Sequence, residues 1–88
     1  MSVIFDIENL GSRIALLRKE QRLSQTELAR QAGVSRAMIS DLETGQIRDP
    51  GVRKVLRVLK ALGMGLRIVR LSPPTLDELL AEQEDVHA

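Results

Sequence analysis

Apolar side chains recur every three to four residues along most of the chain, which is the spacing of amphipathic helices. A first helix is predicted over 7–21, with Asp6 as its N-cap and the acidic Glu8 in its first turn. Gly11 falls inside this helix and weakens it. The buried face of this helix holds Leu10, Ile14 and Leu17.

Two short helices follow, separated by three residues. The second begins at a capping box, Ser24-Gln-Thr-Glu27, in which the serine oxygen and the glutamate carboxylate each accept a backbone N–H. It ends at Gly33, because glycine readily adopts the positive φ of a helix stop. The third helix is predicted to follow Ser35 and to end near Thr44. The apolar positions shared by the two helices are Leu28, Ala29, Ala32, Val34, Ile39 and Leu42.

A fourth helix is predicted over 51–62, opened by Pro50 and closed by Gly63. Its apolar stripe is assigned to Val52, Val55, Leu56, Leu59 and Leu62. Residues 66–71 are β-prone and stop at two prolines. Because a strand needs a partner, this segment is expected to pair with its copy in a second chain, and the candidate partner within the chain is residues 3–5. A short acidic helix is predicted from residue 75 to about residue 84.

These elements predict an all-α fold with four to five helices, including a helix-turn-helix, then one short β-strand and a short C-terminal helix. We expect residues 1–63 to form the helix-turn-helix domain. Residues 64–74 are expected to form a dimerisation strand with a proline linker. Residues 75–88 are expected to form an acidic C-terminal helix or tail.

The net charge of +1 conceals an uneven distribution along the chain. Residues 11–70 hold all 13 Lys and Arg and five acidic residues, for a net charge of +8. Residues 71–88 hold five acidic residues and no Lys or Arg, for a net charge of −5. A basic body indicates a polyanionic partner. With one aromatic residue, the chain has no stacking platform for single strands, so duplex DNA is favoured.

Other kinds of chemistry find no support in the sequence. The chain has no cysteine, and its single histidine, His87, lies where a general base would not be held in place. Metal-ligand spacing is absent, and Gly63-Met-Gly65 leads from a helix into the β-prone segment, the reverse of a dinucleotide loop. No apolar stretch approaches the roughly 20 residues of a membrane span. We therefore expect no enzyme activity, no cofactor, no metal and no membrane partner, and a cytoplasmic protein.

The segment Leu23 to Gly45, LSQTELARQAGVSRAMISDLETG, resembles the helix-turn-helix of the phage repressor/Cro (Xre) family. The resemblance covers about residues 10–62 and is most specific in the middle. Within the family, the layout of helices followed by one strand is most similar to HipB-type antitoxins. The resemblance implies a homodimer that binds a palindromic operator in double-stranded DNA.

The resemblance also assigns roles to individual residues. The positions that reach base edges are Ser35, Arg36, Ala37 and Ser40, and the positions that contact phosphates are Gln25, Thr44, Gln46 and Arg48. Arg18 and Glu43 match a structural ion pair between the first helix and the end of the third. Asp41 departs from the amide or basic residue usual at its position, so it is left outside these sets.

The family resemblance implies a sequence-specific repressor. The resemblance of the layout to HipB-type antitoxins implies the antitoxin of an operon that regulates its own transcription, bound to a HipA-like kinase toxin. Two alternatives stay open: a stand-alone Xre-type regulator without a toxin, and an interaction module that has lost DNA binding. The intact set of Gln25, Arg36 and Arg48 favours retained DNA binding.

Overall fold

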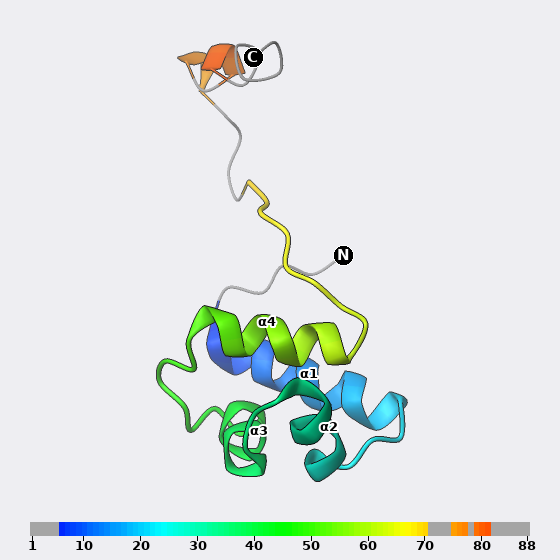
Figure 1. Ribbon diagram of the computed structural model, residues 1–88. Coiled ribbons are helices and arrows are strands. Elements are labelled where there is room, and N and C mark those ends of the chain that lie inside the picture. The colour runs from blue at the N-terminus through cyan, green and yellow to red at the C-terminus, as the bar shows by residue number, and fades with distance from the viewer. Residues whose placement is uncertain (1–5, 71–74, 78, 82–88) are drawn as a thin grey trace.

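The computed structural model describes residues 6–70, 75–77 and 79–81. Its helical body consists of α1 (Ile7–Glu20), α2 (Gln25–Ala32), α3 (Arg36–Glu43) and α4 (Val52–Ala61), as Figure 1 shows. Residues 76–77 and 79–81 are helical as well. The predicted all-helical fold is confirmed. Within these ranges, no helix has both the length and the apolar character that crossing a membrane requires.

The helix ends coincide with the predicted caps. Asp6 caps α1 and Ser35 caps α3 through their side-chain oxygens. The capping box of α2 is complete: the Glu27 N–H donates to the Ser24 hydroxyl at 3.0 Å, and the Ser24 N–H donates to the Glu27 carboxylate at 3.2 Å. Gly33 ends α2 with φ at 69°, in the left-handed region. These ends are set by residues adjacent in sequence.

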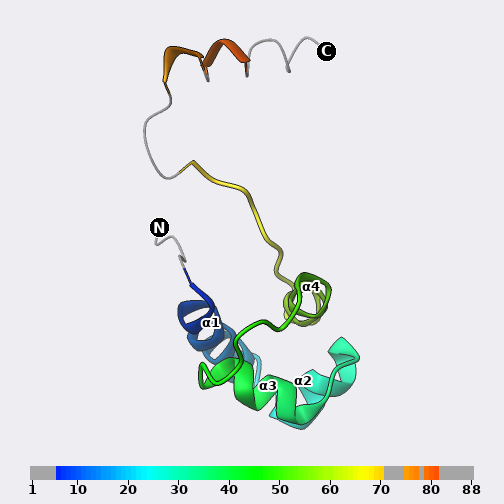
Figure 2. The same ribbon diagram turned by 90° about the vertical axis from the view of Figure 1, so that its left-hand side faces the viewer.

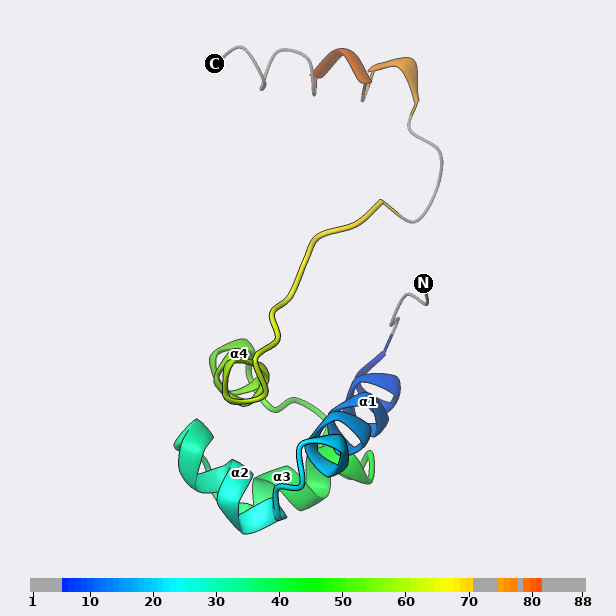
Figure 3. The same cartoon turned by 90° about the vertical axis from the view of Figure 1, so that its right-hand side faces the viewer.

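The four helices share one core. α3 contacts both α1 and α2, and α4 lies against α2, an arrangement that can be followed in the two side views of Figures 2 and 3. The largest fully buried side chains come from all four helices: Ile14, Leu28, Ile39, Leu42 and Val58. Each such side chain contributes roughly 1.5–3 kcal/mol by leaving water. The Gln21 side-chain amide donates to the Leu62 carbonyl at 2.7 Å and joins the ends of α1 and α4.

Gly11 lies where α1 passes the C-terminal end of α3. A Cβ at this position would lie 2.9 Å from the carbonyl carbon of Leu42 and closer still to its oxygen. Any side chain would therefore force the two helices apart. A glycine is about 1 kcal/mol less favourable than alanine inside a helix. Gly11 is nevertheless required, because the α3 backbone leaves no room for a side chain.

The buried side of α4 differs from the predicted stripe. Val58 is fully buried, whereas Val52 and Leu56 are 69% and 41% exposed. The buried residues of this helix and its cap are Val55, Val58, Leu59 and Leu62. Positions 52 and 56 stack on one edge of the helix, and α2 covers the neighbouring edge instead. An apolar edge of α4 is therefore left in contact with solvent.

One further prediction about the C-terminal half is corrected. Pro50 does not open α4, because Gly51, with φ at 82°, is the N-cap and Pro50 precedes it. Residues 66–70 form no strand in the single chain, and Leu71 lies outside the described residues. The segment leads away from α4 in Figure 1, and Ile68 is 100% exposed. A strand cannot form there because a single chain offers no neighbouring strand to complete its hydrogen bonds.

We predict that Gly11→Ala lowers the free energy of unfolding by about 1–3 kcal/mol, the usual cost of overpacking. Urea denaturation of the two proteins measures this difference. Gly65→Ala is the matched control, because a Cβ at Gly65 meets nothing within 4 Å. Equal stability of Gly11→Ala and the parent chain would contradict the requirement for a glycine between α1 and α3.

Candidate nucleic-acid interface

α2 and α3 are joined by a tight turn. Gly33 supplies its left-handed residue, and the Val34 N–H donates to the Ala29 carbonyl at 3.0 Å. Ala29 is buried where the helices meet, so a larger side chain there would separate them. The buried face of α3 holds Met38, Ile39 and Leu42. The opposite face of α3 is consequently turned outward.

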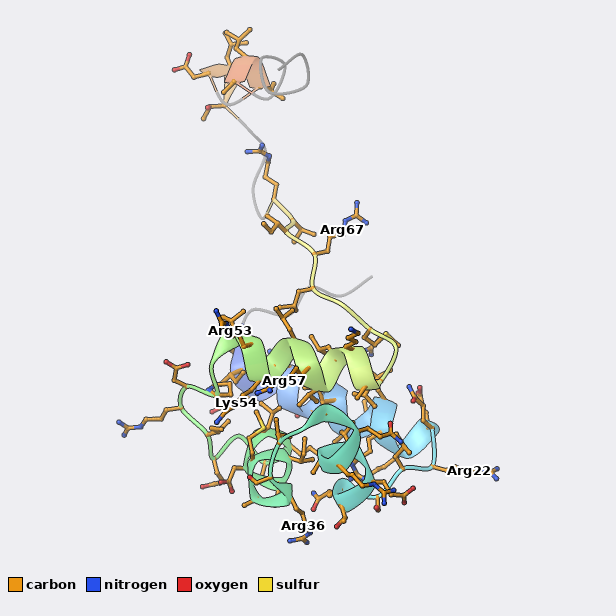
Figure 4. All side chains as sticks on the ribbon, in the orientation of Figure 1. Arg22, Arg36, Arg53, Lys54, Arg57 and Arg67 are labelled. Atoms are coloured by element: carbon orange, nitrogen blue, oxygen red, sulfur yellow. The ribbon has the colours of Figure 1, made fainter. Side chains whose placement is uncertain are left out.

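The outward face of α3 carries the residues predicted to read bases. Ser35, Arg36 and Ala37 are exposed, and Ser40 is half-buried. In Figure 4 the Arg36 side chain points away from the body, at the end of the molecule opposite α4. Within the described residues Arg36 makes no ion pair. The Ser35 hydroxyl accepts the Met38 N–H at 3.0 Å, so its oxygen serves as the cap of α3 while its O–H remains a donor.

The loop after α3 holds three of the predicted phosphate contacts. Thr44 is exposed, and its hydroxyl donates to the Ser40 carbonyl at 2.9 Å. Gln46 and Arg48 are exposed in the loop that leads to α4. The Gln46 backbone N–H donates to the Asp41 carbonyl at 2.8 Å, which closes the end of α3. Thr44 and Gln46 line one hollow beside the C-terminal end of α3, whereas Arg48 lines a different hollow with Ile7, Leu10 and Val52.

Arg18 and Glu43 form the predicted ion pair. The Arg18 Nε donates to Glu43 Oε2 at 2.7 Å, and its Nη2 donates to Oε1 at 2.9 Å, so the pair is bidentate. The Arg18 Nη1 also donates to the Leu23 carbonyl at 2.8 Å. The two charged side chains are only 11% and 6% exposed. The pair thus fixes the end of α3 to α1 and to the turn before α2.

Gln25 joins the same network, which the sequence did not predict. Its side-chain amide is half-buried and donates to Glu43 Oε1 at 3.2 Å. One amide N–H remains for a further acceptor. The first backbone N–H groups of α2 are also without intrahelical acceptors, which favours an anion at this end. The predicted phosphate contact at Gln25 and the structural ion pair are therefore parts of one arrangement.

The environment keeps both members of the pair charged. Burial raises the pKa of the Glu43 carboxyl, but hydrogen bonds from Arg18 and Gln25 and the Arg18 charge outweigh it and hold the pKa below 4.5. The hydrogen bond to Glu43 raises the pKa of Arg18, against a smaller opposing effect of burial. At neutral pH the link between α1 and α3 is therefore fully ionised.

Asp41 is the exposed residue on this side of α3 that the predicted set left out. It lies four positions after Ala37, so the two are neighbours on the helix surface. Its carboxylate makes no ion pair within the part of the chain that the structure describes. The sequence signal that places Asp41 on the outward face is its helical spacing from Ala37. Its negative charge is the reason that it is outside the predicted set of DNA contacts.

Two short helices joined by a glycine turn, the second with a polar outward face and an anchored end, define a helix-turn-helix fold of the DNA-binding class. Residues 14–69 match the family described as Helix-turn-helix. The chain is 43% identical over 61 residues to the uncharacterised HTH-type transcriptional regulator y4mF of Sinorhizobium fredii (strain NBRC 101917 / NGR234), covering 69% of this chain and 79% of that protein.

A second relative is the ImmF control region 10 kDa protein of Bacillus phage phi105, 32% identical over 69 residues, covering 78% of this chain and 76% of that protein. The fold is similar to that of a chain in the solved HipA-HipB-O2-O3 complex, with a TM-score of 0.73 at 21% identity, covering 82% of this chain and all of that one.

The chain belongs to the helix-turn-helix family of the repressor/Cro (Xre) type. It is a DNA-binding transcriptional regulator and not an enzyme.

We predict that the ionised Glu43 makes stability depend on acid pH. Its pKa in the folded chain is below 4.5, so its contribution is complete above 4.5 and is lost as the pH falls through the folded-state pKa. Glu43→Gln should weaken this acid dependence and cost about 1.5–3 kcal/mol at neutral pH, the range for hydrogen bonds to charged groups. Urea denaturation across acid and neutral pH measures both effects.

The matched control for this experiment is Glu20→Gln. Glu20 is exposed at the end of α1 and makes no ion pair within the described ranges. Glu27 stays in both variants, and hydrogen bonds from Ser24 lower its pKa, so some acid dependence persists in each. An acid limb in Glu43→Gln that is as steep as in the control would contradict the assignment.

Proposed function

We propose that this chain is a sequence-specific repressor that binds a palindromic operator as a homodimer. The observation that carries the proposal is the outward face of α3, which is polar, exposed and held in place by the Arg18–Glu43 pair. A helix presented in this way fits the major groove of duplex DNA. The net charge of +8 over residues 11–70 supports a polyanionic partner.

Each residue of the face takes a role that its chemistry allows. Arg36 donates two hydrogen bonds to a guanine, and Ala37 contacts a thymine methyl. The hydroxyls of Ser35 and Ser40 bind a base edge or a neighbouring phosphate. The proposed phosphate contacts are Gln25, Thr44, Gln46 and Arg48.

We predict that Arg36→Ala weakens operator binding by about 1–3 kcal/mol and relaxes the preference at one base position. DNA selected from a random pool by the parent chain should give a palindromic consensus. A gel-shift titration on that consensus then measures the loss. Arg22→Ala removes an exposed cation that points away from the body, on a different side from Arg36 (Figure 4), and serves as the control.

The two variants should differ clearly in this titration. Loss of base contacts changes the sequence preference, whereas loss of a distant cation changes only the general attraction. Unchanged affinity and preference in Arg36→Ala would refute the assignment of α3 to the groove. An absence of any DNA binding that falls steeply with salt would favour the alternative of an interaction module.

The dimer is proposed to form through the segment after α4. Leu66, Ile68 and Val69 are exposed. An apolar hollow of about 340 Å³ lies beside this segment, and its lining includes Ile7, Leu10, Val52, Val55 and Leu66. A small domain leaves much apolar surface in water, and pairing of 66–71 across a two-fold axis removes it. Two recognition helices related by that axis then meet two half-sites.

We predict that Ile68→Asp raises the dimer dissociation constant by about tenfold or more, since 1.4 kcal/mol corresponds to a factor of ten. Sedimentation equilibrium measures the change. Arg67→Gln is the control, because it alters the neighbouring exposed side chain without placing a charge among the apolar ones. A parent chain that stays monomeric at concentrations that saturate the operator would count against the dimer.

We further propose that the chain is the antitoxin of a self-regulating toxin–antitoxin operon and binds a HipA-like kinase toxin. This rests on the similarity of fold to a chain of the HipA-HipB-O2-O3 complex and on the 66–71 segment that follows the helices. The alternative is a stand-alone Xre-type regulator. Co-purification with a kinase-like protein encoded beside this chain's gene distinguishes the two.

A further inference from the structure

The outward face of α4 combines apolar and basic side chains. Val52 and Leu56, here called the apolar edge, are exposed and stack one turn apart. The basic row consists of Arg53, Arg57 and Lys60, which follow the same helical spacing beside that edge. Figure 4 shows Arg53 at the start of α4 and Arg57 and Lys54 along the lower edge of that helix in this view. No ion pair engages the basic row within the described residues.

The charged residues from 50 to 70 are of one sign, and the acidic residue just before them, Asp49, lines the same hollow as Val52. Residues 50–70 contain six Lys and Arg and no Asp or Glu. The cations of α4 therefore have no carboxylate from their own part of the chain. A face of this composition fits an acidic, amphipathic partner, because its apolar edge binds leucines while its basic row binds carboxylates.

The C-terminal residues of this chain have the complementary character. Residues 71–88 contain five Asp and Glu and no Lys or Arg. Leu76, Leu79 and Leu80 recur at helical spacing, all three are exposed, and residues 76–77 and 79–81 are helical. In Figures 1–3 the described residues 75–77 and 79–81 lie apart from the helical body. Two exposed amphipathic faces of opposite charge thus occur in one chain.

We propose that the acidic segment 75–88 binds the outward face of α4 in its own chain. Its leucines lie against the apolar edge, and its carboxylates lie beside the basic row. Individual surface ion pairs contribute less than about 1 kcal/mol, so binding requires the apolar contact and several charges together. This assignment does not depend on DNA binding by α3, since it concerns another face of the molecule, but that face shares Val52 with the hollow of the proposed dimer.

The length of the connection favours the chain's own segment as the occupant. Twelve residues lead from Gly63 to Thr75, which span up to roughly 40 Å when extended. α4 has 10 residues and a length of about 15 Å, so the segment reaches every part of it. A tethered segment acts at an effective concentration on the order of millimolar, which exceeds that of a second copy in dilute solution.

The test uses the full chain with a nitroxide attached to the cysteine of Ala81→Cys. The chain has no other cysteine, so the label is placed at one site. Paramagnetic attenuation of backbone amide signals then reports which residues lie near the label. We expect attenuation of α4, at Arg53, Arg57 and Lys60, and weaker attenuation of α1. It should diminish at 1 M salt, where the Debye length is about 3 Å.

Charge variants separate specific docking from general attraction. Arg53→Glu with Arg57→Glu should abolish the attenuation of α4. Arg13→Glu with Arg22→Glu makes the same change of net charge at exposed positions on α1 and its turn and should preserve it. If circular dichroism shows that the α4 variant is unfolded, Leu76→Ser with Leu80→Ser replaces it, because these leucines lie outside the core.

Three results would overturn the proposal. The first is attenuation that is absent from α4 or uniform over the body. The second is equal loss of attenuation in the α1 and α4 charge variants. The third is attenuation in a mixed sample, in which the labelled chain carries no NMR isotope and the isotope-labelled chain carries no nitroxide. That result would make the segment of a second copy the occupant.

Discussion

The orientation of α3 depends on its close contact with α1. This contact is made by two consecutive residues of α3, Leu42 and Glu43. At Leu42 the α3 backbone comes so near to α1 that only Gly11 fits between them. At Glu43 the side chain is held by Arg18 in a bidentate pair. The desolvation of such a pair offsets much of its attraction, so its main effect is on direction rather than on stability. Backbone approach sets the distance between the helices, and the pair sets their rotation.

The same carboxylate connects α3 to α2. Glu43 accepts hydrogen bonds from Arg18 and from Gln25, so the end of α3 and the start of α2 share one acceptor. A displacement of α3 would therefore move the proposed phosphate contact at Gln25 as well. The two charged side chains are partly buried, although apolar side chains of similar volume are often at least as stabilising. The function requires a fixed angle between two helices, and hydrogen bonds with defined directions supply it.

Features that depend on sequence neighbours could be predicted from the sequence. The capping box of α2 and the glycine stop at Gly33 are examples, because each is complete within a few residues. The role of Gly11 could not be predicted, since it depends on which helix crosses α1. The prediction of the buried edge of α4 was wrong for the same reason. Periodicity places Val52 and Val58 on adjoining edges of the helix, and the position of α2 determines which edge is covered. The Arg18–Glu43 pair, 25 residues apart, came from family resemblance and not from spacing.

The single chain leaves three surfaces exposed, and they differ in chemistry. We therefore infer a different partner for each. The face of α3 is polar, the segment 66–70 is largely apolar, and the outward face of α4 is apolar and basic. DNA bound at α3, as proposed, would leave the other two surfaces free. Val52, however, belongs both to the apolar edge of α4 and to the lining of the hollow beside Leu66. A second copy seated at that hollow and an acidic segment bound to α4 would both bury this valine. The two proposed contacts therefore meet at one side chain, and when both form, dimerisation and binding of the acidic segment would influence each other there.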